Sequence, residues 1–453
     1  MSNDNYILMQ LAEFSAGVDC NKLPEAVIKK IKYCILDALE CCLDGNGTDP
    51  RSRAAWEYVK DRKGSSAAFA KGIRLKNSEA AFYNTVTGAV SSRNDISKSG
   101  SCHAGSIVVP VAFALAEETG CTGKQMMEAV LVGYEAMIRL GIAIRLSAMP
   151  KAFRSTAVLA PFGAAFTSAK LLGLSAEETA NAASFSCHSA GGFNNWVSEG
   201  TGEDVLQNGW GARNGIEAAL LARTGLPSAK GILEDKDGFL AAFSALDHQH
   251  MVTKELGRKW HILDVDYKPM CSCLKLMAPC QITKKLLEKI SDIHQIKQIR
   301  IGVAEKTLHH AGTKETEVDS QIQAIMSIPF GVANVLVFGN YTDIQWNPPY
   351  RKEVTELMKL CVVEEERELT RVFPGKRGAK VTVTMCDGSE FSLLQEDVEG
   401  LTESNIEAMF GQTMTRFYGA ENAVKLQQVL LNLEKEKDLE QVFRILNERS
   451  IWQ

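Results

Sequence analysis

Apolar residues recur at helical spacing along most of the first half of the chain. From about Glu25 to Leu246, one apolar or amphipathic segment follows another, with a polar or glycine-containing break between them. Apolar positions at i, i+3, i+4 and i+7 indicate α-helices that bury one face. Small residues are frequent in these segments and allow the helices to approach closely. The pattern therefore predicts a compact all-helical body.

The breaks between these segments carry residues that end and start helices. Gly173 ends one apolar run, and Ser175 with Glu178 has the spacing of a capping box for the next helix. The same arrangement occurs at Gly120, where a helix is expected to stop, and at Thr122, where its successor is expected to begin.

The pattern changes after Trp260. Residues 295–305 alternate like a strand, and residues 380–394 form two alternating runs around an Asp-Gly pair, which is typical of a β-hairpin. Between them, residues 322–339 are apolar and predict a helix, whereas residues 340–375 give no clear pattern. This block predicts a small α+β domain.

The C-terminal residues 402–448 return to helices, one of them expected to be capped by Ser404, and should dock onto the main helical body. The predicted fold is mainly α. We expect a large helical domain formed by residues 1–262 plus 396–453 and a smaller α+β domain formed by residues 263–395.

Composition and charge exclude several kinds of partner. The chain has 453 residues, 45% of them hydrophobic, and a net charge of -5 with no basic stripe, which argues against nucleic acid. No apolar run reaches the roughly 18 residues of a membrane helix. The N-terminal stretch lacks the basic region of a secretion signal. We therefore expect a cytoplasmic protein that binds neither nucleic acid nor membrane.

The 12 cysteines do not indicate a metal centre. Most of them lie in apolar segments, where free cysteine behaves as a small buried hydrophobe, and disulfides are not expected without a secretion signal. Cys271, Cys273 and Cys280 form a C-x-C-x6-C pattern, which matches no common zinc or iron–sulfur spacing. No metal site is predicted.

The stretch NDISKSGSCHAG, residues 94–105, holds the most informative group of polar side chains. An apolar helix is predicted directly after it, over residues 106–118. A polar loop that ends at a helix start brings titratable groups close to unpaired backbone N–H groups, which suits a small anionic substrate. His103 is the strongest candidate for proton transfer at neutral pH, with a helix-capping or core histidine as the alternative.

Three further residues are candidates, each with a structural alternative. Asp95 could orient His103, act as a carboxylate base, or simply form a turn. Lys268 could neutralise a substrate carboxylate or be a surface lysine. Arg154 could clamp a carboxylate with its planar guanidinium, or form a structural ion pair with Asp204 or Asp95.

Six separated segments, in this order, resemble the MmgE/PrpD family. They cover most of the chain from about residue 25 to 410, and they read ND-x7-HAGSIVVPVAFALAE, FRSTAVLAPFGAAFTSAKLLGLSAEETANAAS, GTGEDVLQNGWGARNGIEAALLARTG, GILEDKDGFLAAF, YKPMCSC and IMSIPFGVA. The resemblance implies a large helical domain with an inserted α+β lid, a homodimer, and activity without metal or organic cofactor. It also implies small di- or tricarboxylate substrates, which lose water or carbon dioxide or regain a proton after proton abstraction beside a carboxylate.

In the loop, the resemblance assigns His103 to the family's histidine and Asp95 to one of its acidic positions. Ser97 lies near the family's hydroxyl position, and the neighbouring acidic position is occupied by Asn94 or Arg93. The resemblance thus makes Ser97 and Arg93 candidates for substrate binding.

Elsewhere about half of the family's polar residues are exchanged. Arg154 replaces a second histidine, Asp204 replaces a lysine (Glu203 if the alignment shifts by one place), and Gln207 stands three residues further on. Lys268 and Cys271 fit the family's Lys-Pro-Tyr-Pro-Cys segment, but the histidine expected just after it is missing. By these positions the resemblance makes Asp204, Gln207 and Cys271, together with Arg154, candidates for substrate binding. The charge reversals put the usual substrate contacts in question.

The leading hypothesis is a cofactor-independent lyase, either a dehydratase or a decarboxylase, acting on a small di- or tricarboxylate. In this hypothesis His103 transfers the proton, and Arg154 and Lys268 hold carboxylates and so make the neighbouring proton more acidic. Asp95 and Lys268 are counted with His103 as the catalytic residues. An epimerase or isomerase, which needs two proton-transfer groups and no leaving-group acid, is the second hypothesis. The third is a member that only binds an acidic metabolite.

Overall fold

The computed structural model describes residues 6–47, 49–146, 152–310, 312–341 and 344–451. Residues 1–5, part of the stretch in which no secretion signal was found, lie outside the described residues. The chain divides into two compact units, which we call the helical unit and the α+β unit. The helical unit comprises Met1–Phe193, Glu203–Tyr267 and Thr402–Gln453, and the α+β unit comprises Asn194–Gly202 and Lys268–Leu401. The boundaries proposed from the sequence lie a few residues before those at Tyr267 and Leu401.

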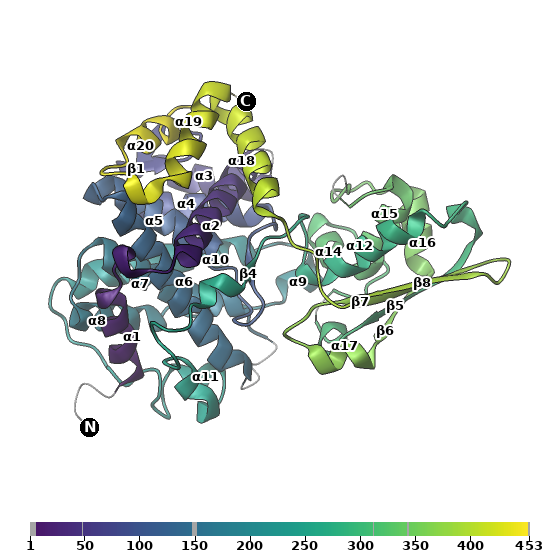
Figure 1. The fold of residues 1–453 in the computed structure, drawn as a ribbon, viewed down its shortest axis with the longest axis horizontal. Coiled ribbons are helices and arrows are strands. Elements are labelled where there is room, and N and C mark those ends of the chain that lie inside the picture. The colour runs from purple at the N-terminus through teal and green to yellow at the C-terminus, as the bar shows by residue number, and fades with distance from the viewer. Residues whose placement is uncertain (1–5, 48, 147–151, 311, 342–343, 452–453) are drawn as a thin grey trace. The chain divides into compact units, whose positions relative to one another are not determined.

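The helical unit is built from long helices, so the mainly α fold class is confirmed (Figure 1). Its helices are α1 (Ile7–Gly17), α2 (Glu25–Asp44), α3 (Pro50–Val59), α4 (Asn77–Val90), α5 (Gly105–Thr119), α6 (Gly123–Leu146), α7 (Ser155–Leu171), α8 (Ala176–Cys187), α10 (Asp204–Ala222), α11 (Phe239–Phe243), α18 (Glu403–Tyr418), α19 (Ala420–Leu431) and α20 (Glu440–Leu446). Helix α7 packs against α6, α10, α8 and α5, and forms the centre of this unit. The C-terminal α18 and α19 pack on α2.

The helix ends follow the predicted cap chemistry in most places. Gly120 ends α5 in the left-handed conformation with φ of 61°, and Ser175 forms a capping box with Glu178 at the start of α8. The prediction for Ser404 is wrong. Thr402 caps α18 instead, because its hydroxyl is placed to accept from the backbone N–H of Asn405.

The helical unit also contains short strands, so the prediction of an all-helical body is wrong in detail. Strands β1 (Lys63–Ala68) and β2 (Ile73–Leu75) form an antiparallel pair. The turn between them holds Ala70 and Gly72 at φ of 63° and 65°, a backbone conformation that a right-handed helix does not contain. Strand β3 (Ile96–Ser97) pairs with β4 (Val265–Asp266), which comes much later in the chain.

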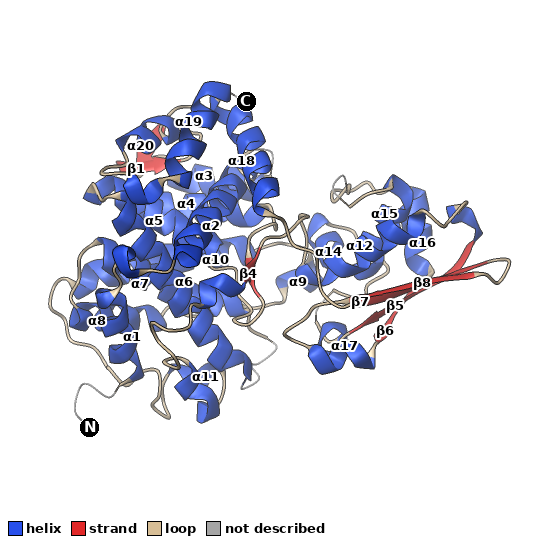
Figure 2. Cartoon of the chain, viewed as in Figure 1, coloured by secondary structure: helices blue, strands red, loops and turns tan. Residues whose placement is uncertain are grey.

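The α+β unit contains a four-stranded sheet in the order β6-β5-β7-β8 (Figure 2). The predicted strand is β5 (Ile296–Val303), and the predicted hairpin is β7 (Ala379–Met385) with β8 (Glu390–Gln395), so both are confirmed. The sheet edge β6 (Cys361–Glu365) runs parallel to β5 and comes from the stretch that gave no clear pattern. The helices of this unit are α9 (Trp196–Glu199), α12 (Leu274–Leu287), α13 (Glu305–Leu308), α14 (Gln321–Met326), α15 (Ile328–Phe338), α16 (Lys352–Lys359) and α17 (Arg367–Val372).

The single helix predicted over 322–339 is wrong, because the chain forms α14 and α15 with a break at Ser327. Pro329 lacks the N–H that a continuous helix would need. The Ser327 hydroxyl accepts from the backbone N–H of Phe330 at 3.0 Å and starts the second helix instead.

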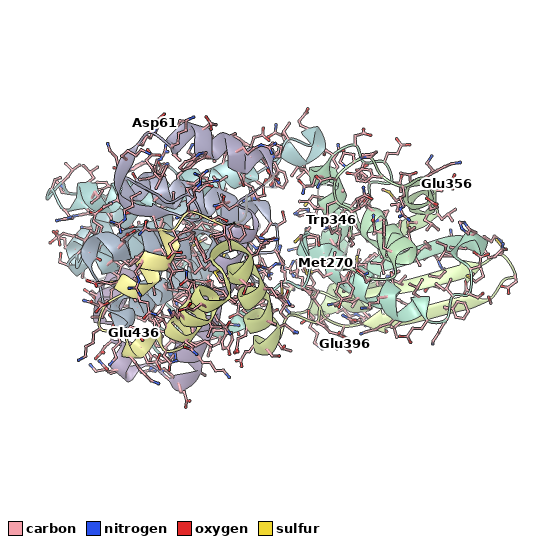
Figure 3. All side chains as sticks on the ribbon, turned by 90° about the horizontal axis from the view of Figure 1, so that it is seen from above. Asp61, Met270, Trp346, Glu356, Glu396 and Glu436 are labelled. Atoms are coloured by element: carbon pink, nitrogen blue, oxygen red, sulfur yellow. The ribbon has the colours of Figure 1, made fainter. Side chains whose placement is uncertain are left out.

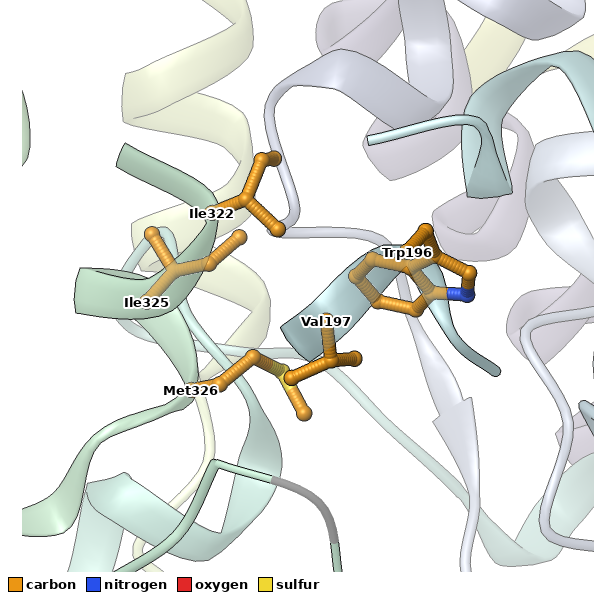
Figure 4. Packing of buried hydrophobic residues seen from close by; sticks show 5 residues of the cluster. All are labelled: Trp196, Val197, Ile322, Ile325 and Met326. Carbon is orange, nitrogen blue, oxygen red and sulfur yellow. The ribbon is translucent and has the colours of Figure 1, made fainter. Parts of the chain in front are cut away.

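A small apolar cluster explains why the segment Asn194–Gly202 belongs to the α+β unit. Trp196 and Val197 of α9 pack with Ile322, Ile325 and Met326, all of which lie in α14 (Figure 4). Trp346, labelled in Figure 3, packs against the same cluster. Burial of these side chains attaches a nine-residue segment to the α+β unit although its sequence neighbours fold elsewhere.

Within the described part of the chain, none of the helices combines the length and the apolar composition that crossing a membrane requires.

Candidate active site

The loop 94–105 is fixed at several points in the helical unit. Ser97 in β3 donates its backbone N–H to the carbonyl of Cys102 at 3.0 Å, and its hydroxyl accepts from the backbone N–H of Gly100 at 3.0 Å. The Lys98 ammonium lies 2.7 Å from the Asp266 carboxylate, beside the β3–β4 pair. These contacts hold the loop in one conformation before α5 begins.

The His103 ring is oriented by the backbone of its own loop. Its Nδ1 lies 2.7 Å from the carbonyl oxygen of Asp95. A carbonyl oxygen can only accept, so Nδ1 carries the hydrogen and the lone pair of the neutral ring is on Nε2. The backbone N–H of His103 is 3.3 Å from the hydroxyl of Thr156 at the start of α7. The side chain is partly buried, and its tautomer suits proton transfer through Nε2.

The Asp95 carboxyl group is 1% exposed and contacts two helices. Its Oδ1 accepts from the backbone N–H of Gly105 at the start of α5 at 3.1 Å, and its Oδ2 accepts from the Tyr134 hydroxyl in α6 at 2.6 Å. Burial, and secondly the nearby Asp37 carboxylate, raise the pKa of Asp95 to about 7. Asp95 therefore orients His103 through its carbonyl, while its carboxyl group holds the loop to the helices.

We expect replacement of Gly105 with alanine to disrupt this arrangement. The added Cβ would lie 2.5 Å from the Tyr134 hydroxyl and 2.9 Å from both Asp95 carboxylate oxygens, which is too close for either contact to survive. Such overpacking costs about 1–3 kcal/mol. Thermal unfolding of Gly105→Ala and of the matched control Gly17→Ala measures the effect, because an alanine Cβ at Gly17 meets open space. An equal melting temperature for the two variants would contradict the geometry.

Arg93 lies in a buried ion cluster with α2. Its guanidinium pairs with Glu40 through Nη2 and lies 3.4 Å from Asp37 through Nη1. The Glu40 carboxylate also accepts from the Thr413 hydroxyl at 2.8 Å. Two carboxylates surround one guanidinium, so the cluster keeps an excess negative charge close to Asp95. The role of Arg93 in substrate binding stays a prediction.

The side chains of Arg154 and Asp204 lie close together, which agrees with the predicted alternative of an ion pair between them. Arg154 donates to the Asn208 side-chain oxygen at 2.5 Å and to the Asp204 carbonyl at 3.3 Å. Its Nη2 is 3.9 Å from Asp204 Oδ2, and Asp204 Oδ1 is buried without a hydrogen-bond partner in the described structure. Burial raises the pKa of Asp204 and lowers that of Arg154. Because Arg154 Nη2 and Asp204 Oδ2 are 3.9 Å apart, the guanidinium can still donate to a second carboxylate.

The start of α7 connects Arg154 with the loop 94–105. Arg154 immediately precedes α7, whose first residue, Ser155, hydrogen-bonds to the Ser101 carbonyl in the loop. Gln207 of α10 donates to the Phe193 carbonyl at 2.9 Å, while its side-chain oxygen is buried without a described partner. The structure therefore brings the loop, the start of α7 and the start of α10 together.

Lys268 and Cys271 belong to the α+β unit, in the segment that precedes α12. Lys268 is 3% exposed, and its ammonium donates to the Ser272 carbonyl at 2.9 Å, so it is not a surface lysine. Cys271 is partly buried. Lys275 follows in the first turn of α12, where burial lowers its pKa to about 7. The catalytic and binding roles of Lys268 and Cys271 stay predictions.

No group of three or more His, Cys, Asp or Glu side chains suited to a metal ion occurs among the residues that the structure describes. The twelve cysteines are free thiols. Nine of them, including Cys102 beside His103, are buried, Cys271 and Cys273 are partly buried, and Cys386 is exposed. Burial raises the pKa of Cys102, so its thiol stays protonated at neutral pH.

The sequence does not indicate a functional role for Tyr134 or Asn208, which contact Asp95 and Arg154 respectively. Tyr134 sits in an apolar helix pattern, where it is indistinguishable from a core residue. Asn208 holds the Arg154 guanidinium and is 1% exposed, but it follows Gln207 without any motif to distinguish it. Only long-range packing reveals their contacts.

Comparison with known proteins agrees with this architecture. Residues 9–251 match the MmgE/PrpD N-terminal domain, and residues 270–435 match the MmgE/PrpD C-terminal domain. The chain therefore belongs to the MmgE/PrpD family, as its six sequence segments predicted. It is 24% identical to cis-aconitate decarboxylase of Aspergillus terreus, with 97% of this chain and 96% of that protein aligned. It is also 24% identical to the human cis-aconitate decarboxylase, with 93% and 90% aligned.

The prediction that this chain is an enzyme is supported by these relatives, since a decarboxylase is a lyase. The similarity extends over nearly the whole length of each chain, so it includes both units.

Proposed function

We propose that this protein is a lyase of the decarboxylase type that acts on a small tricarboxylate similar to cis-aconitate. The observation that carries the proposal is the orientation of His103 by the Asp95 carbonyl, which places the lone pair of the neutral ring on Nε2. The full-length similarity to cis-aconitate decarboxylases supports the choice of substrate class.

The proposed reaction needs a cation and a proton donor. When a carboxylate leaves as carbon dioxide, the electron pair of the broken C–C bond stays on the substrate and must be stabilised and then protonated. His103 would deliver that proton from Nε2 in its imidazolium form and return to the neutral Nδ1–H tautomer, which the Asp95 carbonyl stabilises. If the substrate is dehydrated instead, the neutral ring would remove a proton beside a carboxylate.

Arg154 is proposed to bind a substrate carboxylate that competes with Asp204. We expect Arg154→Gln to raise KM about tenfold to a hundredfold, because a hydrogen bond to a charged group contributes about 1.5–3 kcal/mol. Steady-state kinetics measures this change. The control is Arg416→Gln, which removes a surface guanidinium paired with Asp44 and should leave KM unchanged. Equal KM values for both variants would exclude Arg154 from substrate binding.

The test of the proposed function is turnover by the purified protein on cis-aconitate, citrate and methylcitrate. Release of carbon dioxide from cis-aconitate is expected. Formation of water-elimination products from citrate or methylcitrate would indicate a dehydratase. Exchange of substrate hydrogen with solvent deuterium, without product, would favour an epimerase. Melting-temperature shifts with these compounds but no turnover would leave only a binding protein and would overturn the proposal.

The family resemblance leads us to propose two further properties: a homodimer, and activity without metal or organic cofactor. The composition of the chain leads us to propose a cytoplasmic location. Light scattering on the purified protein tests the dimer. Activity after exhaustive dialysis against a chelator tests the independence from metal. Both measurements are independent of the role proposed for His103.

A further inference from the structure

Tyr134 makes a contact that the proposed reaction has not yet used. Its hydroxyl donates to Asp95 Oδ2 at 2.6 Å, and both side chains are at most 1% exposed. Gly105 approaches the same two groups so closely that even a methyl group would not fit. A buried phenol and a buried carboxyl group in such tight packing have one defined geometry, since a shift of either would leave a polar atom unsatisfied.

Asp95 connects this contact to the catalytic ring. Its carboxylate is held by Tyr134 on one side and by the Gly105 N–H on the other, while its own carbonyl oxygen accepts from Nδ1 of His103. The carboxylate anchors the backbone of residue 95 to α5 and α6, so loss of the Tyr134 contact frees the backbone segment that carries the carbonyl to shift. A displaced carbonyl no longer fixes the ring tautomer.

We propose that Tyr134 is a positioning residue, whose hydroxyl holds the Asp95 carboxylate so that the Asp95 carbonyl keeps the His103 ring in the Nδ1–H tautomer. The proposal deepens the proposed function and rests on it for its consequence in catalysis. Its structural part, the control of the ring by Tyr134, can be tested without any substrate.

The protonation state of Asp95 enters this arrangement, because only the carboxylate can accept from both donors. The pKa of Asp95 is about 7, raised by burial and by Asp37, and lowered in part by the Tyr134 hydrogen bond. Other groups that face Asp95 act in the same electrostatic environment. They are Lys30, Cys34 and Asp37 on α2, Tyr134 on α6, Tyr267 after β4, and Cys102 and His103 in the loop.

The sign of the pH effect follows from these contacts. Above about pH 7 the carboxylate accepts from both donors, and below it the carboxyl group must donate its own proton and one contact is lost. We therefore expect kcat to fall as the pH drops through about 7. Removal of the Tyr134 hydroxyl takes away a contact that favours the carboxylate, so the fall should move upward by about one to two pH units.

The first experiment measures the pH dependence of kcat and KM for the wild type, Tyr134→Phe and Tyr83→Phe. Tyr83 is a matched control, because it is also fully buried in the helical unit and its hydroxyl donates to Asn46 at 3.0 Å. For Tyr134→Phe we expect kcat at pH 7.5 to fall roughly tenfold to a hundredfold with little change in KM, together with the upward shift. Tyr83→Phe should keep the wild-type profile. An unchanged profile for Tyr134→Phe would overturn the proposal.

The second experiment observes the ring directly by NMR with 15N-labelled histidine, the His103 signals being assigned by their absence in His103→Gln. The wild type should show the Nδ1–H tautomer at His103, and Tyr134→Phe should show a tautomer mixture. Asp95→Asn serves as a second variant if Tyr134→Phe does not fold, and its neutral His103 ring should also show a tautomer mixture, because the amide nitrogen of asparagine cannot accept from either donor. A wild-type tautomer in Tyr134→Phe would refute the positioning role. If no substrate is turned over, this readout still decides the proposal, so its failure and that of the proposed function are distinguishable.

Discussion

Replacement of His103 with glutamine is expected to lower kcat for the decarboxylation of cis-aconitate by about 10² to 10⁴-fold. Glutamine can still donate to the Asp95 carbonyl, which lies 2.7 Å from Nδ1 in the wild type, but it cannot carry a proton to or from the substrate at neutral pH. The loop contacts to the helices do not involve the ring, so the fold should be kept. Initial-rate kinetics and a thermal melt of the same sample measure both effects.

The control for this variant is His188→Gln. His188 is exposed at the C-terminal end of α8 and should tolerate the change with wild-type kcat. If His103→Gln keeps a kcat within a few-fold of the wild type while its melting temperature is unchanged, His103 is not the proton-transfer group.

The largest effect on stability is expected for Glu135→Ala. Arg139 is fully buried, and its guanidinium donates to Glu135 at 2.9 Å and to the carbonyls of Lys254 and Lys259, each at 2.7 Å. The other Glu135 oxygen accepts from the backbone N–H of Ile262 at 3.0 Å. Removal of the carboxylate leaves a buried positive charge without its counter-ion, which costs about 3–5 kcal/mol.

Urea unfolding followed by far-UV circular dichroism measures this loss. The matched control is Glu421→Ala, which removes an exposed glutamate paired with Lys425 at i,i+4 on α19 and should change the unfolding midpoint very little. Equal midpoints for the two variants would mean that the buried pair does not hold the 254–262 segment to α6.

Local signals predicted the parts of the fold that depend on neighbouring residues. The capping box at Ser175 and the hairpin around Gly388 depend on side chains and turns within a few residues, and both are present. The sequence pattern does not predict the break at Ser327, because the apolar run resumes directly after this one polar residue, and Pro329 is tolerated in the first turn of a new helix. The β3–β4 pair joins segments far apart in the chain, and no local pattern indicates such pairing.

The candidate site likewise contains some features that local sequence predicts and others that depend on the fold. The loop around His103 could be recognised from its composition and from the start of an apolar helix after it, and the alternative of an Arg154–Asp204 ion pair was available from their charges. The sequence does not predict that the His103 ring contacts the backbone carbonyl of Asp95 rather than its carboxylate, because this contact depends on the backbone path of the loop. The buried cluster around Arg93 depends on α2, some fifty residues earlier in the chain.

Turnover of 13C-carboxyl-labelled cis-aconitate in D2O, followed by NMR, tests the role of His103 in decarboxylation, with wild type and His103→Gln at equal concentration. We expect the wild type to release one labelled carbon dioxide for each substrate consumed and to place one deuterium on the product, whereas His103→Gln should form almost no product. Carbon dioxide release at the wild-type rate by His103→Gln would exclude His103 as the proton-transfer group, and no release by the wild type would exclude a decarboxylase.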